Sequence, residues 1–432
     1  GGAVALITSA RTVLSNHNFE FNKNVFKNIL LPKNFDGSIM RLGDVVRIAK
    51  NQTNDYNMLN FTLLGDPALA VASNNFNAEI VKINGKDINV FQDTLKALQK
   101  VEVECRVSDL NGLFSESFNG RARPIVYDKQ SHEKTLNNDG NGVFEYKYFN
   151  KIIYNGDVSV LNGSFKFTFV IPKDINPEVG LSKILLYANN GTQSALGSNK
   201  KIKIGSFFTD AFNDVLGPEI KLYLNDFGFI DGDKTTSSPL LIACISDSSG
   251  INTIEGSGHD IVLEIDGDRV NSTILNQYFV YNQDSYTDGK IEFKIENLDV
   301  GNHTLSLKVW DSYNNGSEKK INFTVVDGNG LKISRLFNYP NPFTDKTSFY
   351  FEHNNPQSAL EYEITVFSVS GVQVKTLVGS IFNGKFLSPP IEWDGSDDFG
   401  GRMARGVYFY RLKIRNLEGQ VAEKYEKLLY LK

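Results

Sequence analysis

Cysteine is almost absent from the sequence, since Cys105 and Cys244 are the two in 432 residues. Their spacing matches neither a CxxC motif nor a zinc-binding pattern. Cys105 continues the alternating run at 101–107, and Cys244 lies in the apolar run at 240–245. Free cysteine is often buried, so both are predicted to be core thiols. No disulfide between them is expected, because they fall in different predicted domains.

The sequence also lacks long apolar runs and an excess of positive charge. No run reaches the roughly 18 residues that a transmembrane helix needs, and the first residues show no signal-peptide pattern. The formal net charge is -5, so the basic surface typical of nucleic-acid binding is not expected. The hydrophobic content of 41% is ordinary for globular protein, and the length predicts about three domains.

Residues 1–75 predict a partial α/β segment. The apolar run at 3–8 is typical of a strand buried on both faces. A helix is predicted between Asn18 and Pro32, a second from about Arg41, and a strand at 60–64. This order favours the edge of a mostly parallel sheet. A parallel strand needs a crossover before it, so we expect the sequence to be a fragment of a longer protein.

From residue 76 onward, short alternating strands are separated by Gly, Asn and Asp clusters, as in antiparallel sandwiches. One short helix is predicted at 92–99. We divide this region into three all-β, immunoglobulin-like sandwich modules, at 76–206, 207–328 and 329–432. The apolar strand at 427–432 ends the sequence, and we expect its edge to be open for pairing with a partner.

Few residues have the pattern of a catalytic site. The five histidines are scattered over different modules, and neither cysteine has a histidine near it in sequence, so a Cys–His dyad is not expected here. Ser9 is outside any GxSxG motif. The loop at 9–13 follows a strand end, where open α/β sheets bind ligands. It is either a pocket wall or an ordinary connection.

Three acidic clusters lie at 137–142, 226–233 and 394–398. None has the ligand spacing of an EF-hand loop. Turn chemistry accounts for these clusters, and structural calcium is the alternative.

The first 73 residues resemble the end of the gingipain-like cysteine peptidase domain, which is of caspase/gingipain-like α/β type. Four segments carry the resemblance, in this order: Gly1–Arg11, Asn24–Asn28, Leu42–Lys50 and Leu63–Leu69.

Later segments resemble type IX secretion proteins. Those similar to the C-terminal domains of such proteins are Tyr339–Phe343, Trp393–Gly395 and Gly406–Leu412. Those similar to the middle region of a type IX secretion sortase are Tyr154–Ser159, Gly258–Ile261 and His303–Asp311.

This resemblance implies a cell-surface cysteine peptidase and sortase. Such enzymes remove C-terminal secretion signals from cargo and attach the cargo to lipopolysaccharide, through a thioester on cysteine with histidine as base. In the family both dyad residues precede the strand that starts at Gly1. No catalytic residue is therefore assigned here, and the chain alone is expected to be inactive. Ser9, Arg11 and Thr12 are the predicted substrate-binding residues, no metal or cofactor is assigned, and structural calcium stays possible.

The resemblance also implies partners and a location. The expected partners are the outer-membrane barrel protein PorV, through the C-terminal domain, cargo C-terminal signal domains, and anionic lipopolysaccharide as acceptor. The expected location is the extracellular face of the outer membrane. Three alternatives remain: a secreted gingipain-like protease that is itself cargo, a non-enzymatic surface adhesin, and an array of carbohydrate-binding modules. A cluster of exposed aromatic residues on one sandwich face would favour the last.

Overall fold

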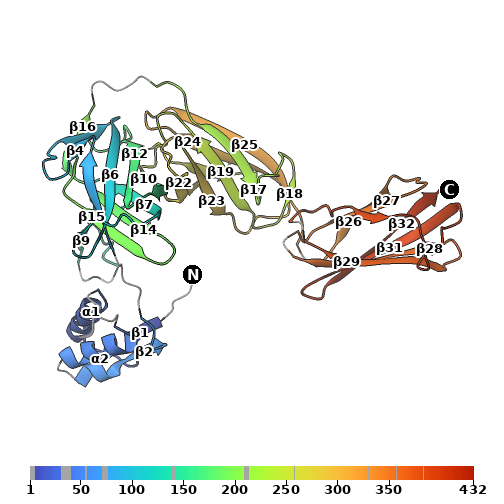
Figure 1. Cartoon of the computed structure of the whole chain (residues 1–432), viewed down its shortest axis with the longest axis horizontal. Helices are drawn as coiled ribbons and strands as arrows, with labels where there is room; N and C mark the ends of the chain where they lie inside the picture. The colour runs from blue at the N-terminus through green and yellow to red at the C-terminus, as the bar shows by residue number, and fades with distance from the viewer. Residues whose placement is uncertain are drawn as a thin grey trace. The chain divides into compact units, whose positions relative to one another are not determined.

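The structure, a computed structural model, describes all residues except 1–4, 31–39, 54–55, 71–75, 139, 141, 209–213, 257, 329, 357 and 383. The chain divides into two compact units, one of residues 1–212 with 281–286 and one of the rest. Strands dominate both units (Figure 1). The multidomain fold class, with a small α/β segment before β modules, is confirmed. The predicted domain boundaries stay predictions.

The N-terminal segment contains two strands and two α-helices. Its elements are β1 (Ala5–Ser9), α1 (Ser15–Leu30), α2 (Leu42–Gln52), a 3-10 turn (Tyr56–Asn60) and β2 (Phe61–Gly65). The helix α1 begins three residues before the predicted Asn18, and Pro32 lies outside the described residues. Among the described residues β1 pairs with β2 alone, and the pair is antiparallel. The expected parallel arrangement is therefore not present in this pair.

One face of the β1–β2 pair is covered by the two helices (Figure 1). Phe21 and Val25 from α1 pack with Val45, Val46 and Ala49 from α2 in one apolar cluster. That cluster also contains Met58 and Phe61, with Ile7 and Leu63 against it. The other face is open, since Leu6 and Leu64 are each 53% exposed. The expectation of a strand buried on both faces is wrong for the described segment.

The first sandwich module is built from fourteen strands in the described part of unit 1. They are β3 (Phe76–Ile83), β4 (Lys86–Asp87), β5 (Thr94–Ala97), β6 (Lys100–Asp109), β7 (Gly120–Tyr127), β8 (Ser131–Lys134), β9 (Glu145–Tyr148), β10 (Ile152–Asn155), β11 (Val158–Val160), β12 (Ser164–Val170), β13 (Gly180–Leu181), β14 (Lys183–Asn189), β15 (Ser194–Asn199) and β16 (Lys203–Phe207). The large sheet runs β10-β7-β14-β15-β3-β6-β12, and a smaller one runs β13-β16-β5.

Alternation along the strands places one set of side chains inside this module. Val101, Val103, Cys105 and Val107 on β6 are at most 3% exposed, so Cys105 is a core thiol as predicted. The helix predicted at 92–99 is wrong, because β5 forms there and pairs with β16. Hydrogen bonding to a distant strand overrides a short helical pattern.

The second module is a sandwich of two sheets, ordered β17-β19-β23-β22 and β18-β25-β24-β20-β21. Its strands are β17 (Glu219–Leu224), β18 (Lys234–Thr235), β19 (Leu240–Ser246), β20 (Val262–Ile265), β21 (Thr273–Ile274), β22 (Phe279–Tyr281), β23 (Asp288–Lys294), β24 (Gly301–Trp310) and β25 (Gly316–Val325). Cys244 is half-buried, opposite Lys221 and Lys290 on the neighbouring strands. It is not the core thiol expected, because Ala243 and Ile245 occupy the inner face of β19.

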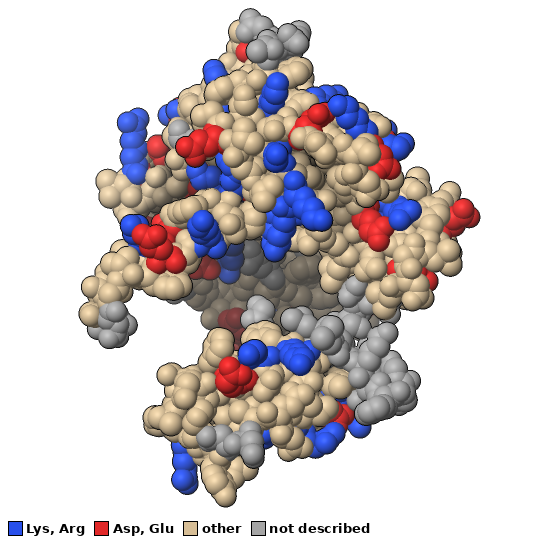
Figure 2. All heavy atoms as spheres, turned by 90° about the vertical axis from the view of Figure 1, so that its left-hand side faces the viewer, with Lys and Arg blue, Asp and Glu red and all other residues tan. Residues whose placement is uncertain are grey.

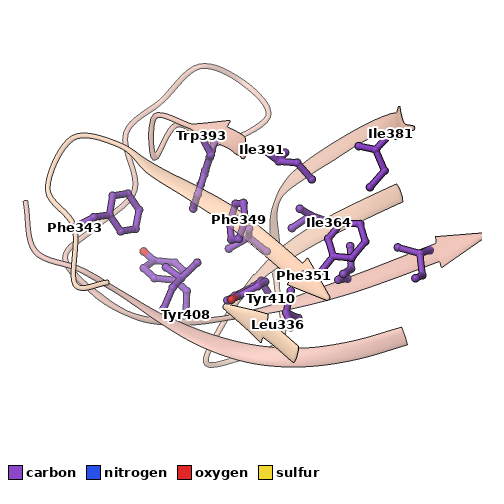
Figure 3. Close-up of a cluster of buried hydrophobic side chains, with 14 of the residues drawn as sticks. Leu336, Phe343, Phe349, Phe351, Ile364, Ile381, Ile391, Trp393, Tyr408 and Tyr410 are labelled. Carbon is purple, nitrogen blue, oxygen red and sulfur yellow. The ribbon is translucent and has the colours of Figure 1, made fainter. Parts of the chain in front are cut away.

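The third module pairs a three-stranded sheet, β26-β27-β30, with a four-stranded one, β29-β28-β31-β32. Its strands are β26 (Ile333–Tyr339), β27 (Thr347–His353), β28 (Leu360–Ser368), β29 (Gln373–Ile381), β30 (Ile391–Trp393), β31 (Gly406–Asn416) and β32 (Val421–Tyr430). Figure 3 shows the aromatic centre of its core. The ring centroid of Phe349 lies 4.8 Å from the ring centroid of Tyr410 and 5.8 Å from that of Trp393.

Candidate functional site

The three predicted substrate-binding residues lie close together in sequence at the end of β1 and just after it. Ser9 ends β1 opposite Phe61 and is half-buried, while Arg11 and Thr12 are exposed in the short connection to α1. The backbone N–H of Ala10 donates to the carbonyl of Asn60 at 2.7 Å, which extends the strand pairing by one residue. The start of the loop is therefore fixed by a backbone hydrogen bond, and Arg11 and Thr12 are accessible to solvent. Its role in binding stays a prediction.

The described histidines and cysteines do not form a catalytic pair. His17, closest in sequence to the predicted loop, has its Nδ1 3.0 Å from Asn57 Nδ2. Cys105 and Cys244 are both free thiols. Burial raises the pKa of each, and for Cys244 this outweighs the lowering by Lys290 and Lys221. A nucleophilic cysteine needs the opposite shift, so the geometry gives neither thiol a catalytic role.

One group of carboxylates among the described residues is close enough to share a metal ion. The carboxylate oxygens of Asp214, Asp247 and Asp311 lie within 4.8 Å of one another. Asp311 is fully buried and accepts the backbone N–H groups of Tyr313 and Asn315 at 2.9 and 2.7 Å. These residues lie outside the three clusters singled out in the sequence. Because Asp214, Asp247 and Asp311 are far apart along the chain, no local sequence pattern indicates that their carboxylates lie together.

Burial and neighbouring negative charge raise the pKa of two of these aspartates. Burial raises the pKa of Asp311, and the neighbouring Asp247 carboxylate raises it further. Burial likewise raises the pKa of Asp247, with a further rise from Asp214. Hydrogen bonds from Asn315 to Asp311 and from Ser249 to Asp247 oppose these shifts. The turn residues thus stabilise the charged forms in part.

The edge of the last strand is covered, contrary to the expectation that it is open. The backbone N–H of Phe343 donates to Leu429 at 3.1 Å, and that of Leu431 donates to Phe343 at 3.0 Å. Leu428 and Tyr430 are each 1% exposed and belong to the core. This stretch of β32 therefore closes the module and offers no free edge to another strand.

None of the described helices is long and apolar enough to cross a membrane.

Comparisons with known proteins give one family match. Residues 1–72 match the model of peptidase family C25, and no curated protein matches the chain. A crystal structure of dimeric latent PorU from Porphyromonas gingivalis is similar at 30% identity, over 93% of this chain and 38% of that one, with a TM-score of 0.40. The resemblance of this chain to the gingipain family and to a type IX secretion sortase is thereby confirmed. The chain spans 38% of the length of that PorU chain.

Other solved structures are similar at much lower identity. A tetra-tandem repeat of a large adhesion protein matches at 12% identity, over 83% of this chain and 74% of that one, with a TM-score of 0.18. Three fibronectin-type domains of chicken CNTN1 match at 9% identity, over 82% and 98% of the two chains, with a TM-score of 0.22.

Proposed function

We propose that this chain is the C-terminal part of a cell-surface cysteine peptidase and sortase of family C25. The protein would remove C-terminal secretion signals from cargo and attach the cargo to anionic lipopolysaccharide at the outer membrane. The observation that carries the proposal is the family match over residues 1–72, and the sequence likeness to PorU supports it.

The open face of the β1–β2 pair supports a larger peptidase domain. Leu6 and Leu64 stand opposite each other with about half of each side chain exposed. Fully burying a leucine stabilises a fold by roughly 1.5–3 kcal/mol, so covering this pair would contribute about half of that for each residue. Further strands or helices of the same domain would cover them. The Cys–His dyad would lie in that additional part, upstream of Gly1.

In this proposal the cysteine thiolate attacks the peptide carbonyl before the signal, and a histidine takes the thiol proton. The signal leaves with a free amino terminus, which takes the proton from the histidine, and the cargo is held as a thioester. A nucleophilic group of the lipopolysaccharide then attacks that thioester, gives up its proton to the histidine and displaces the cysteine thiolate. Ser9, Arg11 and Thr12 would contact the substrate from the loop after β1. The third module would hold the enzyme to PorV.

The test compares the 1–432 chain with a longer polypeptide from the same gene that includes the upstream segment. Both are incubated with a cargo protein carrying its C-terminal signal domain and with lipopolysaccharide. We expect the longer protein alone to release the signal domain and to add lipopolysaccharide mass to the cargo. Loss of the signal domain without that added mass would favour a secreted protease, and no cleavage by either protein would favour an adhesin.

A further inference from the structure

The first sandwich module contains a cleft where two parallel strands separate. β3 and β15 pair at two positions only, Phe76 with Ala195 and Asn77 with Leu196. Gly197 then passes so close to the carbonyl oxygen of Ala78 that a Cβ there would lie 1.8 Å from it. Beyond this point the strands border a cleft of about 800 Å³. The glycine is required by the close approach of the two backbones.

The lining of this cleft suits a polar ring compound. The loop after β4 contributes Asn89, Phe91 and Gln92, and the end of β15 contributes Ser198 and Asn199. Amide and hydroxyl groups can exchange hydrogen bonds with hydroxyl-rich ligands, and an aromatic ring offers a flat apolar face. This combination is typical of a saccharide site.

The acidic residues of the cleft already have partners. Glu79 accepts two hydrogen bonds from Arg106 at 3.1 and 3.0 Å and one from Ser108 at 3.1 Å. Asp93 is paired with Lys86, and Asp87 accepts the N–H of Asn89 at 2.8 Å. The two lysines of the lining are Lys201 and Lys203, and neither makes an ion pair with a carboxylate among the residues that the structure describes.

These two lysines belong to a group of five at or next to the ends of β10, β14, β15 and β16, in the large and the smaller sheet, which we call the lysine row. Its members are Lys151, Lys183, Lys200, Lys201 and Lys203. Strand pairing brings these lysines near one another. Tyr127 lies opposite both Lys183 and Ile152, and Ile152 follows Lys151. Asn199, which precedes Lys200, lies opposite Ile184, and Lys203 lies opposite Leu181. None of the five makes an ion pair with a described carboxylate, although other lysines of this module do.

An aromatic pair stands within the lysine row. Lys183 Nζ lies 5.5 Å from the ring centroids of both Tyr127 and Phe149. In Figure 1, β15 and β16 lie on the side that Figure 2 turns toward the viewer, where Lys and Arg side chains gather across the middle of the upper part. Like charges held together in this way attract a polyanion, because its binding relieves their repulsion.

We propose that the cleft and the lysine row bind an anionic polysaccharide, the glycan of the lipopolysaccharide acceptor, which rests on the function proposed above. The cleft takes a sugar ring, and the lysine row takes the phosphate or carboxylate groups along the chain. The chain as a whole has a net charge of -5, so the attraction is local to this surface.

The test measures binding of the 1–432 chain to purified anionic lipopolysaccharide, to the same material after chemical removal of phosphate, and to polyglutamate. The variant is Lys200→Gln, Lys201→Gln, Lys203→Gln. Its matched control is Lys82→Gln, Lys134→Gln, Lys166→Gln, which removes equal charge from ion-paired lysines of the same module. Lys82 is partly exposed and the other five lysines are exposed at the surface, and melting curves confirm that each variant is folded.

We expect the lysine variant to lose about tenfold or more in affinity for anionic lipopolysaccharide at low salt, and the control to change little. Gln92→Ala, in the cleft, is expected to weaken binding without changing its dependence on salt. Equal losses in variant and control, no binding at all, or equally tight binding of polyglutamate would overturn the proposal. None of these measurements needs peptidase activity. If the longer protein has no such activity and lysine-dependent binding persists, the proposed function fails and the glycan site stands.

Discussion

The side chain of Asn341 pairs with the backbone of Leu429 as a neighbouring strand would. Its Oδ1 accepts the N–H of Leu429 at 3.0 Å, and its Nδ2 donates to the carbonyl of Lys427 at 3.1 Å. Phe343 adds backbone hydrogen bonds to Leu429 and from Leu431. The segment from Tyr339 to Phe343, noted in the sequence for its family resemblance, therefore has a structural role. It covers the edge of the last strand.

Asn341→Ala is expected to destabilise the third module by about 1–2 kcal/mol, because two hydrogen bonds to strand β32 are lost. The measurement is the urea midpoint, followed by the fluorescence of Trp393, which is 3% exposed in that core. Glu418→Gln, at an exposed turn position, serves as the control. A midpoint shared by both variants would mean that Asn341 does not secure the edge.

The strand pattern of the β modules could be predicted because alternation is a local property. Tyr408, Tyr410, Leu412 and Ile414 all face the core of the third module, since side chains two apart share a face of a strand. The α2 helix begins at Leu42, next to its predicted start at about Arg41.

The features that the sequence did not reveal depend on distant partners. The cover over β32 comes from Asn341, 88 residues from Leu429, and the helix expected at 92–99 gives way to pairing with β16. Cys244 was expected in the core. A strand formed by an apolar run still has two faces, however, and the thiol of Cys244 lies on the outer face of β19. The lysine row was missed because its members come from three separate stretches of the chain.

The third module is expected to lose stability as the pH falls from about 6.5 to 4, because of His353. Burial lowers the pKa of this residue to about 4 from 6.5, and its Nδ1 accepts the N–H of Asn355 at 3.3 Å. The unfolded chain takes up a proton below pH 6.5, whereas the folded chain resists it until about pH 4. The stabilisation present above pH 6.5 is thus lost in this window, by about 3 kcal/mol at most.

The measurement is the urea midpoint of the third module at pH 7 and at pH 5, for the native sequence and His353→Leu. The variant should show little change between the two pH values. His303 in the second module is the internal contrast. Burial alone lowers its pKa, but hydrogen bonds to the Asp299 carbonyl and the Asp266 carboxylate raise it overall, so its contribution is lost as the pH rises. A loss of the same size in His353→Leu would show that another group titrates.

Leu6→Ser with Leu64→Ser is expected to have little effect on the 1–432 chain. Both side chains lie on the open face of the β1–β2 pair, so the change should cost less than about 1 kcal/mol. Phe61→Ala is the contrast, because Phe61 is 4% exposed within the helix cluster and large core truncations cost about 3–5 kcal/mol. Hydrogen exchange of α1 and α2 measures both effects.

The same leucine pair gives a different expectation in the longer polypeptide. If more of the peptidase domain covers Leu6 and Leu64, the double serine variant should become destabilising there by about 2 kcal/mol or more. Equal exchange rates for the serine variant and the native sequence in the longer protein would show that the face stays open. In that case the additional part of the domain does not cover Leu6 and Leu64.

The two thiols are expected to react at very different rates in the native protein. Cys105 is 3% exposed between β3 and β12, and Cys244 is half-buried on an outer sheet face. Burial raises the pKa of both, so neither should react faster than an ordinary thiol.

At pH 8 a maleimide should modify one thiol per native chain slowly and two after denaturation, as read from intact mass. Cys244→Ser should abolish the native modification. Rapid labelling of Cys105 would instead show that the first sandwich opens readily, and rapid labelling of Cys244 would point to an activated thiol.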